Sequence, residues 1–361
     1  MRFLPLTETF IYNEATSIKA YRVLVFCAQR QNADKFPYND VRSVSDLSLP
    51  FYALNGVMLR LSLGCPYFSG VISKEDVRLL HAHYGPTGTR MLPLKRRHGI
   101  PLITSFRGMD ASLLPSKDPG MYDRLFDEGD LFLARSQDMV KDLETLGCPK
   151  GKAVAHHSGI MLDDFRHAER LAEEEVVFLT VARLAQNKGV QDAVEAFATV
   201  NREHPHTRLR IVGEGPQRGE LEKLIRSLDL EGMVELAGAM PHNKVLDEML
   251  KAHVFVLPSF TTSEGEKEGI PNALMEAQAT GMPVVSTRHA GIPELVSDGK
   301  TGLLVDERDI AGLASKMSWL VDNAGQWGKM GREGRRRVEE EFDILMQCAK
   351  IEAIYARFIG D

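Results

Sequence analysis

The feature that most constrains the fold is an alternation, along the whole chain, of short apolar runs with amphipathic stretches. Parallel strands need crossover connections, which helices usually provide, so this alternation predicts parallel sheets covered by helices. The runs are rich in Val, Ile and Leu, as expected of strands buried on both faces. We expect strands at residues 22–27, 79–83, 101–106, 130–135, 152–156, 176–182, 209–212, 234–237, 254–257, 283–286 and 303–305.

With 361 residues, the chain is longer than one hydrophobic core usually supports, so two domains are expected. A charged stretch that ends at Glu175 precedes the strand predicted at 176–182, and we interpret it as a connector. We therefore predict a first domain at residues 1–160 and a second at 165–340. The stretch 332–359 has helical apolar spacing, and we expect its end, about residues 341–361, to pack back on the first domain.

Composition argues against several classes of protein. The net charge of −6 is unlike that of a nucleic-acid-binding domain, which is usually strongly basic. The four cysteines lie far apart without a CxxC pair, so they form neither a disulfide framework nor a zinc site and fit a reducing compartment. No run approaches the roughly 18 apolar residues of a membrane-spanning helix. We expect a cytoplasmic protein, and contact with the inner face of a membrane stays open.

The first domain begins unusually. An α/β domain of this kind normally starts with a central strand, but the helical stretch 10–19 follows Met1 almost at once. A strand of about five residues is expected before Thr7, and residues 1–4 are too short to cross a sheet. We therefore predict that Met1 is an internal methionine or the start of an expressed fragment, with a native chain that extends upstream by about ten residues or fewer.

The most informative segment runs from Glu268 to Glu276. Pro271 suits the first position of a helix, which we expect to continue to Thr280. The N-terminus of a helix carries free N–H groups and about half a positive charge, so it suits a diphosphate. In a regular helix, residues seven positions apart differ by about 20° in direction and about 10 Å in rise. Two such carboxylates can hold hydroxyls at both ends of a nucleotide sugar. On spacing alone, two unrelated glutamates remain an alternative.

Further motifs surround this segment. Together with residues 268–277, they resemble glycosyltransferase family four, in which the two glutamates form an E-x7-E motif. The resemblance implies the GT-B fold, with two Rossmann-like, doubly wound parallel-sheet domains facing a cleft. It also implies transfer with retention of configuration and without a metal. The other matching segments are 181–189, 213–216, Pro241, 258–259, 281–287, 291–299 and 301–305.

The resemblance implies a role for each matching residue. Glu268 would hold the donor sugar and Glu276 the ribose. Arg183 and Lys188 would steady the leaving diphosphate, as a planar fork and a point charge respectively. A metal does this elsewhere, but the Asp-x-Asp metal clamp is absent here, so neither a metal nor a cofactor is expected. The other implied donor-binding residues are Gly213, Gly215, Pro241, Gly269, Ile270 and Pro271.

A glycine-rich turn supports an alternative function. Gly213-Glu-Gly215-Pro-Gln-Arg-Gly219 follows a predicted strand, with Glu235 further on, which is a passable dinucleotide fingerprint of an NAD-linked oxidoreductase. The turn lies in the middle of a domain, however, and in the resembled family it passes near the donor nucleotide. We prefer that reading. A sugar-nucleotide epimerase and a degenerate GT-B protein that binds nucleotide sugar without turnover also stay open.

The first domain matches less closely. Residues 7–11 with Glu14 resemble the entry loop of the branch that makes exopolysaccharide and O-antigen sugars, which places Glu8 and Thr9 on the acceptor side. His83 ends a predicted strand, where open sheets bind ligands. The family commonly has Thr-x-His-Gly-x-Asp at the next strand end, and we count Asp110 as an acceptor-side residue. Arg107 replaces that histidine and could contact an acceptor phosphate or carboxylate, or the site could be altered.

These features give one prediction of function. We expect a retaining, metal-independent hexosyltransferase that moves a sugar from a UDP- or GDP-sugar to a hydroxyl of a saccharide or polyprenyl-linked acceptor, in exopolysaccharide or lipopolysaccharide biosynthesis. The first domain would bind the acceptor and the second the donor, with Glu268, Arg183, Lys188 and His83 as catalytic residues. The basic run at 95–98 is either a solvated helix end or a contact for anionic lipid.

Overall fold

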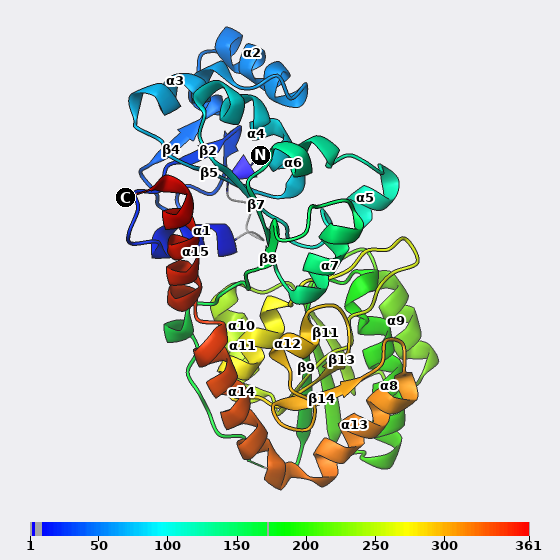
Figure 1. Ribbon diagram of the computed structural model, residues 1–361. Coiled ribbons are helices and arrows are strands. Elements are labelled where there is room, and N and C mark those ends of the chain that lie inside the picture. Colours follow the sequence, from blue (N-terminus) through cyan, green and yellow to red (C-terminus); the bar gives the residue numbers. More distant parts are fainter. Residues whose placement is uncertain (1, 4–8, 172, 361) are drawn as a thin grey trace. The chain divides into compact units, whose positions relative to one another are not determined.

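The computed structural model describes residues 2–3, 9–171 and 173–360. The chain divides into two compact units, and the last helix belongs to the first of them (Figure 1). Unit 1 comprises residues 1–159 and 344–361, and unit 2 comprises residues 160–343.

Unit 2 is a doubly wound α/β domain with a parallel six-stranded sheet in the order β11-β10-β9-β12-β13-β14. The first strand of the unit, β9, lies in the middle of the sheet. The order in which strands are added changes side between β9 and β12, as in nucleotide-binding Rossmann folds. Its elements are β9 (Val176–Val181), α8 (Val190–Glu203), β10 (Thr207–Val212), α9 (Arg218–Ser227), β11 (Val234–Gly238), α10 (His242–Lys251), β12 (Val254–Leu257), α11 (Asn272–Ala279), β13 (Val284–Thr287), α12 (Ile292–Leu295), β14 (Gly302–Val305), α13 (Ile310–Asp322) and α14 (Trp327–Glu341), with single 3-10 turns at η2 (Leu162–Asp164), η3 (Gln186–Lys188) and η4 (Ala324–Gln326).

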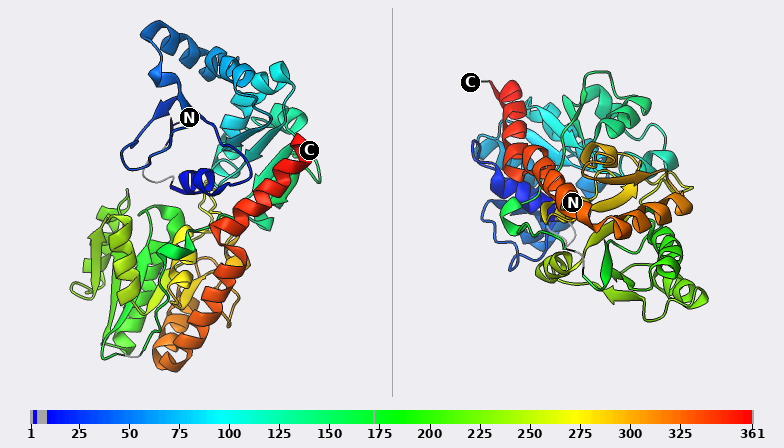
Figure 2. Two further views of the ribbon diagram at one scale, coloured as in Figure 1. Left: turned by 90° about the vertical axis from the view of Figure 1, so that its left-hand side faces the viewer. Right: turned by 90° about the horizontal axis from the view of Figure 1, so that it is seen from below.

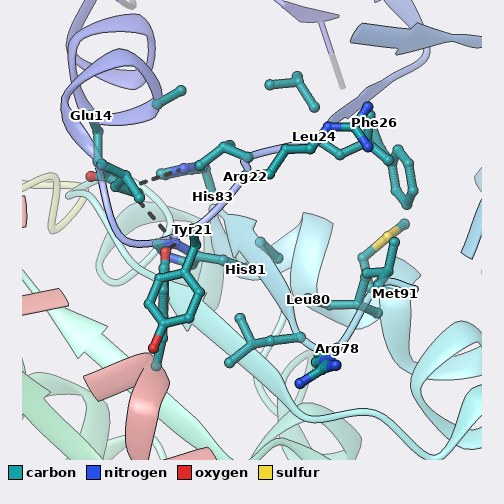
Figure 3. Close-up of a pocket in the computed structure, with 18 of the residues that line it drawn as sticks. Glu14, Tyr21, Arg22, Leu24, Phe26, Arg78, Leu80, His81, His83 and Met91 are labelled. Carbon is teal, nitrogen blue, oxygen red and sulfur yellow. Dashed lines mark hydrogen bonds and ion pairs between the residues drawn. The ribbon is translucent and has the colours of Figure 1, made fainter. Parts of the chain in front are cut away.

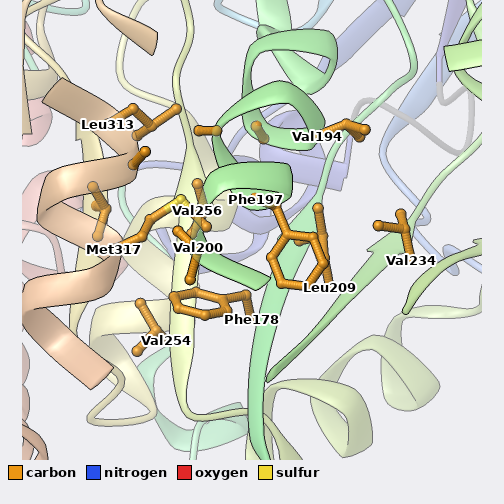
Figure 4. Packing of buried hydrophobic residues seen from close by; sticks show 14 of the residues in the cluster. Phe178, Val194, Phe197, Val200, Leu209, Val234, Val254, Val256, Leu313 and Met317 are labelled. Carbon is orange, nitrogen blue, oxygen red and sulfur yellow. The ribbon is translucent and has the colours of Figure 1, made fainter. Parts of the chain in front are cut away.

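The core of unit 2 explains why its strands read as continuous apolar runs. Phe178 of β9 and Val254 of β12 pack against Phe197 of α8 and Met317 of α13, all fully buried on one face of the sheet (Figure 4). Leu179, the neighbour of Phe178, belongs to the core on the opposite face. Burial of each such side chain stabilises the folded state by about 1.5–3 kcal/mol. Apolar residues are therefore favoured on both faces of the sheet.

Unit 1 is also α/β, but its strands form separate sheets. A parallel four-stranded sheet has the order β5-β6-β7-β8, and two two-stranded parallel sheets pair β2 with β4 and β1 with β3. Its elements are β1 (Arg2–Phe3), α1 (Thr9–Ser17), β2 (Val25–Cys27), β3 (Gln29–Arg30), β4 (Val41–Ser43), the 3-10 turn η1 (Val44–Asp46), α2 (Leu49–Arg60), α3 (Pro66–Lys74), β5 (Leu80–His83), α4 (Gly85–His98), β6 (Leu102–Ser105), α5 (Leu113–Lys117), α6 (Asp123–Glu128), β7 (Leu131–Ala134), α7 (Gln137–Thr145), β8 (Ala153–Ala155) and α15 (Ile344–Ile359).

The end of the chain forms two helices where one was expected. The predicted helix at 332–359 is interrupted between α14 and α15, because Phe342 is fully buried and its carbonyl accepts a hydrogen bond from Ile160 N (2.9 Å). α15 then runs beside α1 and along the unit 1 sheet (Figure 2). There Ile351 and Tyr355 pack against Ile103, Leu131 and Leu133 of the sheet.

Among the described residues of unit 1, no strand joins the four-stranded sheet to the two-stranded sheets. β5 pairs only with β6 and β2 only with β4 among the described strands, and a cavity of about 800 Å³ lies between them. β4 was not expected from the sequence, since its three residues, Val41, Arg42 and Ser43, carry too little apolar signal. Within the described residues, no helix is both long and apolar enough to cross a membrane.

Candidate active site

The predicted donor side of unit 2 lies where its parallel strands end. Two glycines hold the loops after β9 and β10 together. A Cβ on Gly213 would lie 1.8 Å from Ala182 O, and one on Gly215 would lie 2.4 Å from Leu184 O, so no other residue fits without a shift. Leu184 N in turn donates to Glu214 O (2.9 Å). The glycine-rich turn therefore fixes the loop that carries Arg183.

Three charged side chains lie at this edge of the sheet, those of Arg183, Lys188 and Glu268. Arg183 is exposed directly after β9. Lys188 ends η3, and its Nζ lies 2.7 Å from Oε2 of Glu268, with both side chains less than one-fifth exposed. Asn187 Nδ2 donates to the other oxygen of Glu268 at 2.8 Å. The glutamate is thus held by two neighbours from the loop after β9.

The loop before α11 has the expected arrangement, shifted by one residue. Pro271 has extended backbone (φ −64°, ψ 126°) and is the N-cap, so the helix begins at Asn272 rather than at Pro271. Ile270 is buried, and Gly269 and Pro271 are buried beside it. The free N–H groups of the first turn of α11 follow directly, a suitable place for phosphate.

Glu276 lies in the second half of α11 and differs from Glu268 in its surroundings. Burial raises the pKa of Glu276 to about 7, and no charged group of the described chain offsets that effect. A carboxylate in this state gains from any hydroxyl or amide donor brought to it. Pro241, at the start of α10, follows β11 at the same edge of the sheet. The structure brings Lys188 and Glu268 into contact, while Glu276 has no ion-pair partner among the residues that the structure describes.

Two of the predicted site residues of unit 1, His83 and Arg107, meet around the buried glutamate Glu14. Glu14 of α1 lies 3.5 Å from His83 Nε2 and 3.7 Å from His81 Nδ1 (Figure 3). It also lies 3.5 Å from Arg107 Nη2 and 3.6 Å from Arg135 Nη2. Burial would raise the pKa of Glu14, but His83 and Arg107 lower it to about 2. Glu14 is therefore ionised at neutral pH.

The histidines of this cluster are neutral at pH 7. Burial lowers the pKa of His81 to about 4 and that of His83 well below its usual value. Arg107 Nη2 lies 2.6 Å from Nδ1 of His83. Since an arginine can only donate, this nitrogen accepts, and the ring proton is on Nε2, which faces Glu14. In this arrangement, His83 Nε2 cannot act as a general base.

Glu14, His81 and His83 could in principle form a metal site, because one ligand atom of each lies within 4.8 Å of the others. Two observations argue against a resident cation. Both ring nitrogens of His81 already have partners, Tyr355 Oη at 2.6 Å and Ser105 Oγ at 2.8 Å. The guanidinium groups of Arg107 and Arg135 also lie within 3.6 Å of the carboxylate that a metal would need. Like charges so close in a buried site would repel the ion.

The remaining acceptor-side residues have different surroundings. The carboxylate of Asp110 is buried and accepts from the backbone N–H groups of Gly85, Arg107 and Gly108 at 2.8–3.1 Å. It therefore fixes the loop after β6 against the start of α4. Arg107 also lies over the ring of Phe10, 4.3 Å from its centroid. Thr9 is exposed at the start of α1, and Glu8 lies outside the described residues.

Known glycosyltransferases resemble most of the chain. A family model for glycosyltransferase family 4 matches residues 8–164, and one for group 1 glycosyl transferases matches residues 163–337. The amylovoran biosynthesis glycosyltransferase AmsK of Erwinia amylovora is 34% identical over 286 residues, which cover 78% of this chain and 70% of that protein. The chain belongs to glycosyltransferase family 4.

Relatives of this family 4 chain include a putative colanic acid biosynthesis glycosyltransferase, WcaL, of Salmonella typhimurium. It is 39% identical over 244 residues, which cover 66% of this chain but only 60% of that protein. Among solved structures, Anabaena HepE in complex with UDP superimposes with a TM-score of 0.78 at 16% identity, over 97% of this chain and 96% of HepE. That similarity shows the shared two-unit GT-B fold.

Several residues of these family 4 sites were not predicted. Arg135 follows β7 and His156 follows β8, and both approach Glu14. His289 follows β13, accepts a hydrogen bond from Glu268 N (3.1 Å) through Nε2 and lies 2.7 Å from Glu307. Each follows a parallel strand, so the rule that ligand sites form at carboxyl strand ends could have found them. Glu14 itself carried only the signal of the entry-loop motif.

Proposed function

We propose that this chain transfers a sugar from a nucleoside-diphosphate sugar, UDP- or GDP-linked, to a hydroxyl of a saccharide or lipid-linked saccharide, with retention and without a metal. The observation that carries the proposal is the group at the carboxyl end of the unit 2 sheet. It combines Lys188 paired with Glu268, an exposed Arg183 and the N-terminus of α11. HepE, which shares the fold, is described in complex with UDP, which makes UDP the first nucleotide to test.

The donor would replace contacts that exist in the free protein. Its diphosphate would lie at the N-terminus of α11, where Arg183 and Lys188 offset its charge. Lys188 would then divide its interaction between the phosphate and Glu268. This would free Glu268 to accept hydroxyls of the sugar, while Asn187 and His289 keep its side chain and backbone in place. Glu276 would accept the ribose hydroxyls.

Transfer then needs no protein nucleophile. The acceptor hydroxyl would approach the face of the sugar from which the diphosphate leaves, and the bond to the new oxygen forms as the bond to phosphate breaks. The departing phosphate oxygen takes the hydroxyl proton, so the charge that develops is confined to the diphosphate. Arg183 and Lys188 would stabilise that charge in the transition state.

The unit 1 cluster supports an acceptor role of a limited kind. Glu14 is ionised, but it already faces two guanidinium groups, and His83 donates toward it. We propose that the cluster positions the acceptor through Arg107 and the neighbouring loop, rather than removing its proton. His83 is then a positioning residue.

Ligand-induced stabilisation tests the donor assignment most directly. The full chain should melt at a higher temperature with one nucleoside diphosphate and its sugar than with the others among UDP, GDP and ADP. A ligand present at about 100 times its Kd stabilises the protein by about 2.7 kcal/mol. If none of these nucleotides shifts the melting temperature at millimolar concentration, the donor site is wrongly assigned.

We also propose peripheral contact with an anionic membrane, through α2 rather than through the basic run. In that run, Lys95 pairs with Asp130 (2.5 Å) and Arg96 with Glu128 (3.5 Å), as in a solvated helix end. By contrast, α2 and the loop after it expose large apolar side chains at 45–79%. These are Leu49, Phe51, Tyr52, Leu54, Val57, Leu61 and Leu63.

Charge supports a lipid as the partner of this surface. Between Asp46 and Glu75 the sequence has no acidic residue, and its charged residues are Arg60 and Lys74. Interfacial helices combine such an apolar face with basic residues.

The full chain should sediment with vesicles that contain phosphatidylglycerol. Leu54→Asp should reduce the bound fraction at least fivefold, whereas Leu171→Asp, at a still more exposed leucine of unit 2, should not. Equal loss in both variants would contradict the assignment.

A further inference from the structure

A buried histidine connects the loop between β12 and α11, which carries Glu268, to the chain that follows β14. His289 comes after β13, and its side chain is fully buried. Its Nε2 accepts a hydrogen bond from the backbone N–H of Glu268 (3.1 Å), and its Nδ1 lies 2.7 Å from Oε1 of Glu307. Since Nε2 accepts, the ring proton is on Nδ1 and is donated to Glu307. These two contacts fix both the orientation and the tautomer of the ring.

Glu307 is held in turn by the beginning of the same loop. Its Oε2 accepts a hydrogen bond from the backbone N–H of Thr261 (2.8 Å), and its Oε1 accepts one from Thr261 Oγ1 (3.4 Å). Burial would raise the pKa of Glu307, but the hydrogen bonds from Thr261 and His289 lower it below its usual value. Glu307 is therefore ionised at neutral pH, and an ionised carboxylate is a strong acceptor for the imidazole N–H.

The next residue, Arg308, provides a second attachment for the loop. Its guanidinium lies 4.5 Å from the centroid of the Phe260 ring, and its Nη1 lies 2.8 Å from Oδ1 of the buried Asp192 in α8. Arg308 has a left-handed backbone conformation (φ 64°), which is uncommon for residues other than glycine and persists where surrounding contacts impose it. Residues 307–308 thus fix the beginning of the loop at residues 260–261.

The contact with His289 gains importance when a donor binds. In the free protein, Lys188 and Asn187 hold the carboxylate of Glu268 at 2.7 and 2.8 Å. The proposed diphosphate would take up part of the interaction of Lys188. The hydrogen bond from Glu268 N to His289 would stay unchanged, because a fully buried ring does not contact the donor. It therefore holds the backbone of the residue that is assigned to the sugar.

We propose that His289, oriented by Glu307, is a positioning residue for sugar transfer, which holds the backbone of Glu268 where its carboxylate meets the donor sugar. The inference rests on the proposed function for the assignment of Glu268 to the sugar. A misplacement of about 1 Å caused by a residue remote from the chemistry can lower a rate by about 10²-fold. The loss should appear in transfer and not in affinity for the bare nucleoside diphosphate.

Two substitutions separate the functions of the two ring nitrogens. A glutamine amide reaches the place of Nε2, so His289→Gln can still accept from Glu268 N. The shorter asparagine reaches the place of Nδ1, so His289→Asn can still donate to Glu307 but does not reach Glu268 N. We expect His289→Gln to keep kcat within about fivefold of wild type and His289→Asn to lower it by about 10²-fold.

Controls show whether these losses are specific. Both variants should bind the nucleoside diphosphate within about twofold of the wild-type Kd, as measured by calorimetry. His206→Asn, at an exposed histidine of unit 2, should change neither quantity. Equal losses of kcat in His289→Gln and His289→Asn would overturn the proposal, because a purely structural ring would not distinguish them.

A double mutant tests whether His289 acts through Glu268. In the Glu268→Gln background, His289→Asn should lower kcat by less than about twofold more, because the side chain that it positions has already lost its function. A further loss of about 10²-fold would show that His289 acts independently of Glu268, and it would overturn the proposal.

The state of the ring can be measured without turnover. Long-range ¹H–¹⁵N correlation spectra of the histidine-labelled full chain at pH 7 should show His289 as a neutral ring with its proton on Nδ1. A proton on Nε2, or on both nitrogens, would overturn the inference, and this measurement needs only the unmodified protein. If the wild-type chain binds no nucleoside diphosphate, the proposed function fails. Wild-type transfer together with the wrong tautomer would overturn the role of His289 alone.

Discussion

The carboxyl strand ends of the two units differ in how their charges are satisfied. In unit 1, Glu14 and Arg135 are nearly inaccessible, and the charges of the cluster face one another. In the described part of unit 2, Arg183 is exposed, Glu276 has no ion-pair partner, and Lys188 and Glu268 form an ion pair. A closed network contributes mainly to structure and positioning, whereas an open one gains most from a ligand. The predicted donor unit thus has the open network, and mutations should separate the two.

Breaking the closed network should have the largest effect. Glu14→Gln leaves two buried guanidinium groups without their carboxylate, which typically costs about 3–5 kcal/mol. Urea unfolding at pH 7 should show this loss for unit 1, while Asp127→Asn, at an exposed carboxylate of the same unit, should change the free energy of unfolding by less than about 0.5 kcal/mol.

Acid should remove the same contribution. Because the pKa of Glu14 in the folded state is about 2, below the ordinary 4.5, its stabilisation is complete above pH 4.5 and lost as the pH falls toward 2. The difference between wild type and Glu14→Gln should shrink over that window. A difference that is constant down to pH 2 would contradict the network.

The open network should act on catalysis rather than on stability. Lys188→Ala should lower kcat/KM by about 10³-fold, the scale of removing one group that stabilises transition-state charge. Its unfolding free energy should change little. Lys329→Ala, at an exposed lysine of α14, is the matched control. Loss of stability without loss of turnover would make Lys188 a structural residue.

The two glutamates of unit 2 should separate in their effects. Glu268→Gln should leave the affinity for the bare nucleoside diphosphate nearly intact and lower transfer by about 10²-fold, as for a lost positioning contact. Glu276→Gln should weaken binding of the same diphosphate, because Glu276 is assigned to the ribose. Calorimetric titration and initial rates measure the two effects. The same loss of diphosphate affinity in both variants would contradict the separate roles.

Proton release gives a smaller but specific effect. With a pKa of about 7, Glu276 is roughly half protonated at pH 7, and ribose hydroxyls would favour its ionised form. Diphosphate binding should therefore release up to about half a proton at pH 7, seen by calorimetry in buffers of different ionisation enthalpy. The raised pKa also means that the contribution of Glu276 to stability falls as the pH rises from 4.5 to 7. Glu276→Gln should remove both effects.

Chelation should have the smallest effect. If Arg183 and Lys188 replace a metal, the rate in EDTA should match the rate with Mg²⁺ within about twofold. Loss of activity in EDTA that Mg²⁺ restores would assign diphosphate stabilisation to a metal, and it would remove the contrast between the two units.

Much of unit 2 follows from local sequence. Its strands lie within one or two residues of the predicted positions because each is a short apolar run buried on both faces. The sequence could predict that Lys188 and Glu268 lie near each other, because both are in loops at the carboxyl ends of parallel strands. The start of α11 differed by one residue, because Pro271 serves as its N-cap.

Other features depended on contacts between distant parts of the chain. The break between α14 and α15 has no proline or glycine at Phe342, and it arises from burial of that ring and its hydrogen bond to Ile160. The cluster around Glu14 joins α1 to the ends of β5, β6 and β7, and no spacing predicts such a meeting. The sequence alone determined the two-unit parallel-sheet fold and the donor-side motif, because apolar period and strand-end position are local properties. Which charges became buried partners was decided by packing between elements far apart in the chain.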